Sequence, residues 1–104
     1  MPIWGMEPFD GFDWDDGNRQ KCQKHGVSIA EIELLLTTAA KIAPDLKHSR
    51  SEERSLAVGR DSQGRAMFVV FTVRSIRGQK LVRPISARYM HKKESQGYEE
   101  EEGS

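Results

Sequence analysis

The sequence predicts one small α+β domain, in which helices precede and follow an antiparallel sheet. Three observations support this prediction. A capping box opens an apolar-faced helix at Ser28, a continuous apolar run covers residues 66–74, and turn residues flank that run on both sides. The 104 residues are enough for one modest hydrophobic core. We predict a three-stranded meander with a candidate fourth strand at its N-terminal edge, two helices before it and one after it, in a single domain over residues 1–98.

The N-terminal part contains the candidate edge strand and the first helix. Residues 9–14 alternate aromatic with acidic or small residues, which is typical of a short strand. Asp15 or Asp16 is suited to cap a helix that runs to Lys24 or His25. Gly26 stands where a residue with positive φ commonly ends a helix.

The second helix is predicted from its cap and its apolar period. In Ser28-Ile29-Ala30-Glu31 the hydroxyl accepts a backbone N–H and the carboxylate reaches back, as in a capping box. One apolar face then continues through Ile29, Ile32, Leu35, Leu36, Ala39 and Ala40. Pro44 is expected to end this helix, and residues 44–53 are expected to form a loop.

Three strands and a last helix are predicted in the second half. Residues 54–60 alternate, residues 66–74 suit a strand buried on both faces, and residues 81–88 form the third strand. Pro84 has no N–H for a ladder, so the third strand needs a bulge or an open side there. Residues 89–98 are expected to be helical, and residues 99–104 to form a solvated acidic tail.

The net charge of zero conceals a segregation of charge along the chain. All 16 Lys and Arg residues lie within residues 17–93, where only six of the 16 acidic residues are found. A middle this basic is suited to bind a polyanion, because clustered cations displace the counterions around phosphates. The alternative is that these charges only solubilise the surface.

Several other classes of protein are excluded or disfavoured. Cys22 is the single cysteine, so no internal disulfide forms, and a reducing compartment fits. The apolar run at residues 67–73 is too short to cross a bilayer, and the N-terminus has no signal-peptide pattern, so we expect a cytoplasmic protein without membrane contact. No His or Cys pair has the spacing of metal ligands, and no cofactor motif is present.

An ordered series of short motifs resembles the BrnT family of toxins. No motif is specific alone, but their order and spacing over residues 12–98 are. The series is Phe12-Asp13-Trp14-Asp15, Lys24-His25-Gly26-Val27-Ser28, Glu52-Glu53-Arg54, Gly59-Arg60, Gly64-Arg65, Phe71-Thr72-Val73-Arg74, Ile85-Ser86-Ala87-Arg88, Lys93-Glu94 and Tyr98.

This resemblance implies a fold similar to RelE-type ribonucleases and the cleavage of RNA to arrest growth. It further implies a BrnA-like ribbon-helix-helix antitoxin as the partner. In that family the toxin–antitoxin complex represses its own operon, so operator DNA is contacted only through the complex.

The candidate catalytic residues suit a metal-independent endoribonuclease. His25 stands at a predicted helix end and is the first candidate for acid or base, because histidine is the side chain most often used for proton transfer in catalysis. Arg74 and Arg88 are candidates to hold the scissile phosphate, because guanidinium matches phosphate geometry. Glu53 is a candidate base. The alternatives are a capping role for His25 and structural ion pairs for the others.

The candidate RNA-binding residues are Lys24, Arg54, Arg83, Lys92 and Tyr98. For Lys24, Lys92 and Tyr98 the alternative is a solvated or packing side chain. For Arg54 and Arg83 it is a structural ion pair with Glu52 or Glu53, or protection of a strand against edge aggregation. We expect the His25 imidazole and guanidinium groups from separate strands, with Arg74 and Arg88 converging, to meet around one phosphate-sized pocket. Two other functions remain open, a non-catalytic antitoxin-binding co-repressor and a non-cleaving RNA-binding module.

Overall fold

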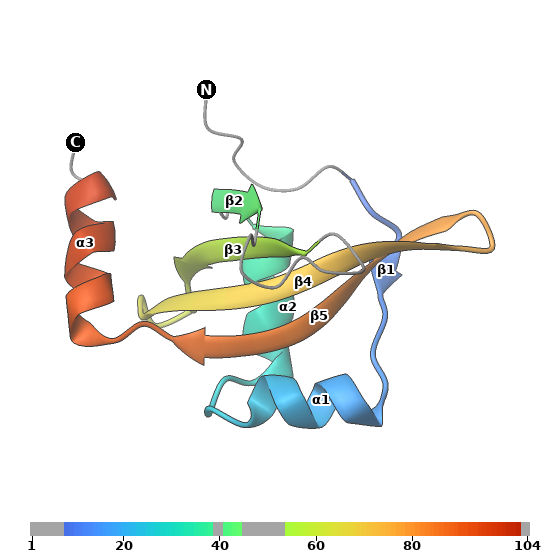
Figure 1. The fold of residues 1–104 in the computed structure, drawn as a ribbon, viewed down its shortest axis with the longest axis horizontal. Coiled ribbons are helices and arrows are strands. Elements are labelled where there is room, and N and C mark those ends of the chain that lie inside the picture. The colour runs from blue at the N-terminus through green and yellow to red at the C-terminus, as the bar shows by residue number, and fades with distance from the viewer. Residues whose placement is uncertain (1–7, 39–40, 45–53, 103–104) are drawn as a thin grey trace.

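The computed structural model describes residues 8–38, 41–44 and 54–102. Figure 1 shows its elements in chain order, which are β1 (Gly11–Phe12), α1 (Asp16–Gln23), α2 (Ile29–Thr37), β2 (Lys41–Pro44), β3 (Ser55–Arg60), β4 (Ala66–Ile76), β5 (Gln79–Tyr89) and α3 (Lys92–Glu102). The strands form one sheet in the order β1-β5-β4-β3-β2. This confirms the α+β class, the two helices before the meander and the one after it.

The sheet has more strands than the meander predicted from the sequence. The candidate edge strand is present as β1, which pairs parallel with β5 through Gly11 and Leu81 and through Phe12 and Val82. The other strand pairs are antiparallel. The added strand is β2, which pairs with β3 at the opposite edge.

Two local features begin and end α1 as predicted. Asp15 is its N-cap and accepts the backbone N–H of Asn18, and the side chain of Asn18 accepts the N–H of Asp15 in return. Gly26 follows with φ of 87°, in the left-handed region. At α2 only half of the predicted capping box forms. Ser28 accepts the N–H of Glu31, whereas the Glu31 carboxylate accepts from the backbone and hydroxyl of Ser62.

The predicted C-terminal end of α2 is wrong. The helix ends at Thr37, whose hydroxyl donates to the carbonyl of Glu33 four residues earlier, a bond that competes with continued helix formation. Ile42 and Ala43 pair with β3 instead, because an extended segment there satisfies the backbone of the sheet edge. Of the predicted loop over residues 44–53, all but Pro44 lies outside the described residues.

The last helix begins later and extends further than predicted. Tyr89, expected to be helical, ends β5 by pairing with Met67, and α3 runs from Lys92 through Glu102. Residues 99–102, expected in a solvated tail, are part of this helix. Lys41 binds Glu101 at 2.9 Å, and Arg60 pairs with Glu102. These pairs hold the helix by charge, since no residue of α3 is buried.

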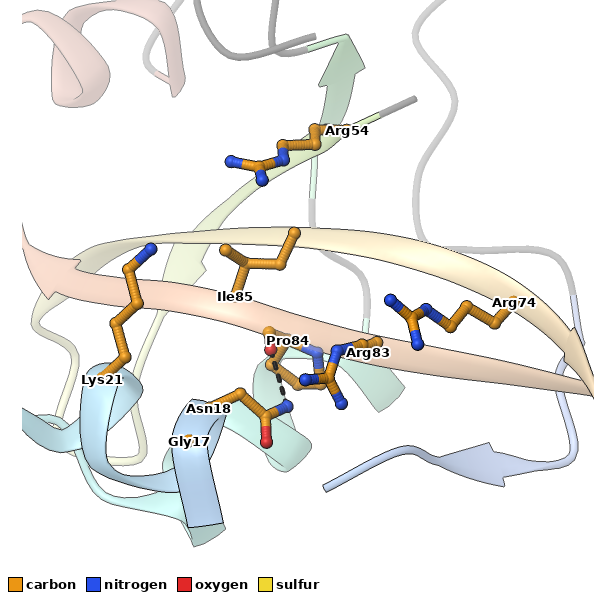
Figure 2. A pocket seen from close by; sticks show the side chains of 8 residues that line it. All are labelled: Gly17, Asn18, Lys21, Arg54, Arg74, Arg83, Pro84 and Ile85. Atoms are coloured by element: carbon orange, nitrogen blue, oxygen red, sulfur yellow. Dashed lines mark hydrogen bonds between the residues drawn. The ribbon is translucent and has the colours of Figure 1, made fainter. Parts of the chain in front are cut away.

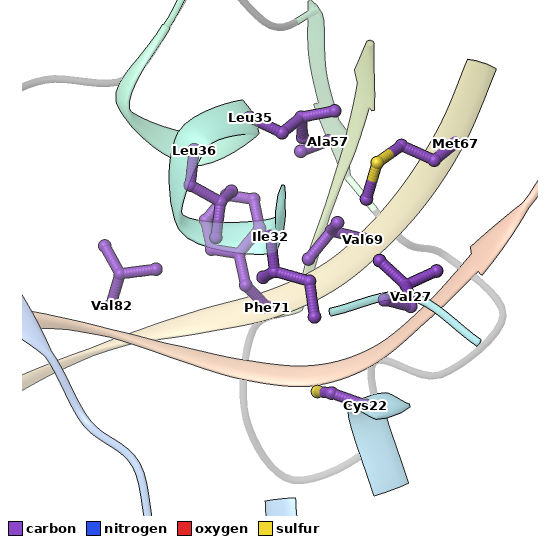
Figure 3. Close-up of a cluster of buried hydrophobic side chains, with 11 residues drawn as sticks. Cys22, Val27, Ile32, Leu35, Leu36, Ala57, Met67, Val69, Phe71 and Val82 are labelled. Atoms are coloured by element: carbon purple, nitrogen blue, oxygen red, sulfur yellow. The ribbon is translucent and has the colours of Figure 1, made fainter. Parts of the chain in front are cut away.

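The hydrophobic core lies between α1, α2 and one face of the sheet. Figure 3 shows helix side chains packed on strand side chains, the core being Cys22, Val27, Ile32, Leu35, Leu36, Ala57, Met67, Val69, Phe71, Val82 and Ala87. β4 alternates, with Met67, Val69 and Phe71 buried and Phe68 and Val70 only partly buried. The expectation that this strand is buried on both faces is confirmed only in part: on the face opposite the helices Thr72 is buried, whereas Phe68 and Val70 are partly buried.

A β-bulge at Pro84 changes which side chains of β5 share a face. Val70 pairs with Ser86 but Phe71 pairs with Pro84, so Ile85 is an extra residue in β5. The bulge that Pro84 predicted is confirmed. Its consequence is that Arg83 and Ser86, which pair with Thr72 and Val70, lie on the same face of the sheet although they are three residues apart.

Candidate functional site

A pocket opens beside the bulge, between α1 and the sheet. Its volume is about 290 Å³, at the lower end of the range for ligand pockets. Four cationic side chains from separate elements line it, and Figure 2 shows them around one space. The lining residues are Gly17, Asn18, Lys21, Arg54, Arg74, Arg83, Pro84 and Ile85.

The register of the strands brings the arginines together. Arg83 of β5 pairs with Thr72 of β4. Leu56 of β3 pairs with Val70, so Arg54, two residues earlier, lies level with Thr72 on the other side of β4. Arg74 follows two residues further along the same side of β4. Three arginines from different parts of the chain therefore lie close together in space.

Asn18 connects α1 to this part of the sheet. Its Nδ2 donates to the carbonyl oxygen of Pro84 at 2.8 Å and to that of Asp13 at 3.0 Å. Asn18 is buried, so these bonds are shielded from water. They set the distance between β5 and the helix that carries Lys21.

Two carboxylates at the N-terminal side of α1 hold the pocket arginines. Arg83 Nη2 donates to Asp15 Oδ2 at 2.8 Å, and Arg83 Nη1 lies 3.5 Å from Asp13. Arg74 Nη1 lies 3.8 Å from the same Asp13 oxygen. The backbone N–H of Asn18, and after it the Arg83 guanidinium, lowers the pKa of Asp15. The hydrogen bond that Arg83 donates to Asp15 raises the pKa of Arg83. The carboxylates thus orient the guanidinium groups and neutralise part of their charge.

Arg54 contributes a guanidinium group to the pocket and also contains a buried donor. Among the residues that the structure describes, its Nε has no hydrogen-bond partner, although the atom is buried. Leaving a buried donor without a partner costs about 1–3 kcal/mol, more when it is charged. The four cations that line the pocket are suited to bind an oxyanion such as a phosphodiester.

Three of the residues singled out from the sequence line this pocket: Arg54, Arg74 and Arg83. Sequence reasoning missed Lys21 and Asn18. One pattern could have indicated them. Lys21 follows Asn18 by three residues and Gly17 by four, so the three share one face of α1. The sequence indicated a strand end at Asp13 and a helix cap at Asp15. It gave no sign that both carboxylates pair with Arg83.

Arg88 lies elsewhere on the sheet. It pairs with Phe68 along β4, whereas Arg74 lies six residues further along that strand, about 20 Å away at the usual rise per residue. Its guanidinium makes two hydrogen bonds to Glu94, at 2.8 and 2.9 Å, and lies over the Phe68 ring. The expected convergence of Arg74 and Arg88 is therefore wrong.

The other singled-out residues are not among those that line the pocket. Lys24 is the C-cap of α1, and His25 is exposed just after it. Lys92 and Tyr98 are on α3, where the Tyr98 ring lies 5.3 Å from the Arg60 guanidinium. Glu53 is outside the described residues.

Within residues 8–38, 41–44 and 54–102, no three His, Cys, Asp or Glu side chains are grouped so as to hold a metal ion. No helix in those ranges is long and apolar enough to span a membrane.

The fold and the pocket define a small α+β domain that presents clustered guanidinium and ammonium groups to a phosphate-sized ligand. Comparison with known proteins gives the family. A model of the BrnT family, described as the ribonuclease toxin of type II toxin–antitoxin systems, matches residues 14–94. The chain belongs to this BrnT family of ribonuclease toxins, which confirms the resemblance found in the sequence. A search of curated proteins found no match.

Proposed function

We propose that the protein is a metal-independent endoribonuclease that binds the scissile phosphate of RNA in the pocket of Lys21, Arg54, Arg74 and Arg83. The observation that supports this most directly is the gathering of these four cationic side chains, from separate parts of the chain, around one pocket. Family membership supports the choice of RNA as the substrate.

The reaction is an attack of the ribose 2′-hydroxyl on the neighbouring phosphorus, which expels the 5′-oxygen. Negative charge increases on the phosphoryl oxygens as the new bond forms. Guanidinium groups already fixed by Asp13 and Asp15 stabilise that charge without having to reorganise. Such fixed cations can supply the electrostatic stabilisation that a metal ion provides in other nucleases.

His25 is our candidate for the acid or base. It stands four residues after Lys21, and Lys24 between them still has helical φ and ψ. One helical turn therefore separates the backbone of His25 from that of Lys21, a rise of about 6 Å. RNA that leaves the pocket along α1 passes both side chains, with Lys24 as a further phosphate contact. Glu53 remains a candidate base.

Cleavage by purified protein tests this function. Wild-type protein should cut single-stranded RNA in EDTA, and Arg54→Ala and Arg83→Ala should each lower the rate by about 10²-fold or more. Lys93→Ala, an exposed charge on α3, is the control and should cut normally. Activity that is lost in EDTA and restored by Mg²⁺ would contradict metal independence. Full activity in both arginine variants would contradict the pocket assignment.

The partner that we propose is a BrnA-like ribbon-helix-helix antitoxin, which neutralises the toxin in the cytoplasm and represses the operon together with it. Its support is that the family's toxins belong to type II toxin–antitoxin systems. Co-expression should restore growth, and the purified complex should shift operator DNA while the toxin alone does not. A toxin that remains active with this antitoxin bound would exclude it as the neutralising partner.

A second candidate is a non-catalytic co-repressor or RNA-binding module. The ion pairs of Asp13 and Asp15 with Arg83 favour it, because they already occupy part of the guanidinium surface. Salt-dependent RNA binding without any cleavage would support this function over the first.

A further inference from the structure

The hairpin between β4 and β5 extends past its neighbours in the sheet. β3 pairs with β4 only as far as Phe71, and β1 pairs with β5 only at Leu81 and Val82. The ladder nevertheless continues to the pair of Ile76 with Gln79. Figure 1 shows this two-stranded ribbon projecting from the end of the molecule opposite α3.

The projecting ribbon carries positive charge and no negative charge. Residues 74–80 contain Arg74, Arg77 and Lys80, and the whole stretch of residues 62–93 has no acidic residue. Asp10 lies beside the ribbon, but its carboxylate accepts the backbone N–H of Lys80 at 2.7 Å. A cationic ribbon of this kind is suited to a polyanionic ligand.

Arg77 is the first of the two central residues in the turn between β4 and β5, a position where asparagine, aspartate or glycine is usual. Its φ is 51° and that of Gly78 is 79°, so both central residues of the hairpin turn have positive φ. Such turns favour Asn or Asp followed by Gly, because other side chains pay a steric cost at positive φ. Arg77 is exposed, so its side chain does not stabilise the core, and its positive φ costs conformational free energy. This combination indicates that the side chain serves binding rather than folding.

We propose that the tip of this hairpin is a second phosphate-binding site, with Arg77 as its main contact, that holds the RNA backbone beyond the pocket. The inference rests on the proposed ribonuclease function. Arg74 lines the pocket, and Arg77 lies three residues further along the ribbon, about 10 Å away. The tip therefore reaches neighbouring nucleotides of a longer RNA and does not reach the phosphate being cut.

The decisive variant is Arg77→Asn, which removes the charge and suits the turn. We expect its melting temperature to equal or exceed that of the wild type. Its affinity for a single-stranded 20-nucleotide RNA should fall by about three- to tenfold, and the slope of log affinity against log salt should become shallower by about 0.7, as for one lost phosphate contact. Arg77→Lys should restore most of the binding, and Lys93→Ala, at the other end of the molecule, should bind as the wild type does.

Cleavage of a dinucleoside monophosphate separates the tip from the pocket. This substrate fills only the pocket, so Arg77→Asn should cut it at the wild-type rate while cutting the 20-nucleotide RNA less efficiently at low concentration. Equal loss on both substrates, or wild-type binding of the long RNA, would overturn the proposal. Weaker antitoxin binding with unchanged RNA binding would also overturn it, in favour of a protein partner.

Failure of the proposed function gives a different result. If the wild type cuts neither RNA, the ribonuclease proposal fails. The affinity and salt slope of Arg77→Asn still decide whether the tip binds phosphate.

Discussion

The Asn18 side chain donates a 2.8 Å hydrogen bond to the carbonyl oxygen of Pro84, at the bulge in β5. The bulge leaves backbone groups without their usual ladder partners, and Asn18 satisfies one of them from α1. The same side chain accepts the N–H of Asp15 at the start of α1. One buried amide therefore couples the cap of a helix to the irregular strand beside the cationic pocket.

Asn18→Ala should lower the free energy of unfolding by about 1–3 kcal/mol, because it leaves the buried carbonyl of Pro84 and the partly buried N–H of Asp15 without this partner. RNA cleavage should also fall, since α1 carries Lys21 into the pocket. Urea denaturation and a cleavage assay measure the two effects. Gln20→Ala, at an exposed position of α1, is the control. A change below about 0.5 kcal/mol would show that the amide does not hold the helix to the strand.

Asp15→Asn should strengthen RNA binding at low salt. The ion pair with Arg83 competes with phosphate for the guanidinium, and asparagine keeps the helix cap while removing the charge. We expect an affinity gain of about two- to fivefold, in line with an exposed ion pair, and a smaller gain in high salt. Fluorescence anisotropy with labelled RNA measures it. Asp16→Asn removes a charge one residue away, and an equal gain there would indicate a general charge effect.

The Arg88–Glu94 pair should make stability depend on acid pH. The Arg88 guanidinium first, and the N–H of His91 second, lower the pKa of Glu94 from 4.5 to about 2. The ionised form is thus favoured in the folded state, so its contribution is fully present above 4.5 and is lost as pH falls toward 2. Melting temperatures of the wild type and Glu94→Gln should differ at pH 7 and converge near pH 2. A constant difference across that range would contradict this linkage.

Cys22 should be unreactive in the folded protein. It is fully buried, and desolvation raises the pKa of its thiol to about 11, so little thiolate exists at neutral pH. A colourimetric disulfide reagent at pH 8 should label it only when urea unfolds the chain. Rapid labelling without urea would mean that α1 opens readily from the core. Cys22→Ala should fold and show no labelling under either condition.

Local patterns in the sequence predicted most elements correctly. Asp15 and Gly26 delimit α1, because a cap and a left-handed glycine act on their immediate backbone. Pro84 predicted the bulge because a missing N–H breaks a ladder wherever the strand pairs. The prediction for the end of α2 failed because pairing with β3, a contact distant in sequence, decides that residues 41–44 are extended.

The sequence alone determined the fold class, the starts of α1 and α2, the basic character of the middle and the family. Which cations act together was decided only by the tertiary structure. Strand register separates Arg74 from Arg88 by several residues along β4, and it places Arg54 and Arg83 on either side of Thr72. Neighbours across a sheet are chosen by pairing between distant segments, and a shift of one residue would send each side chain to the other face. No local pattern carries that information, so the composition of the pocket became visible only in the folded chain.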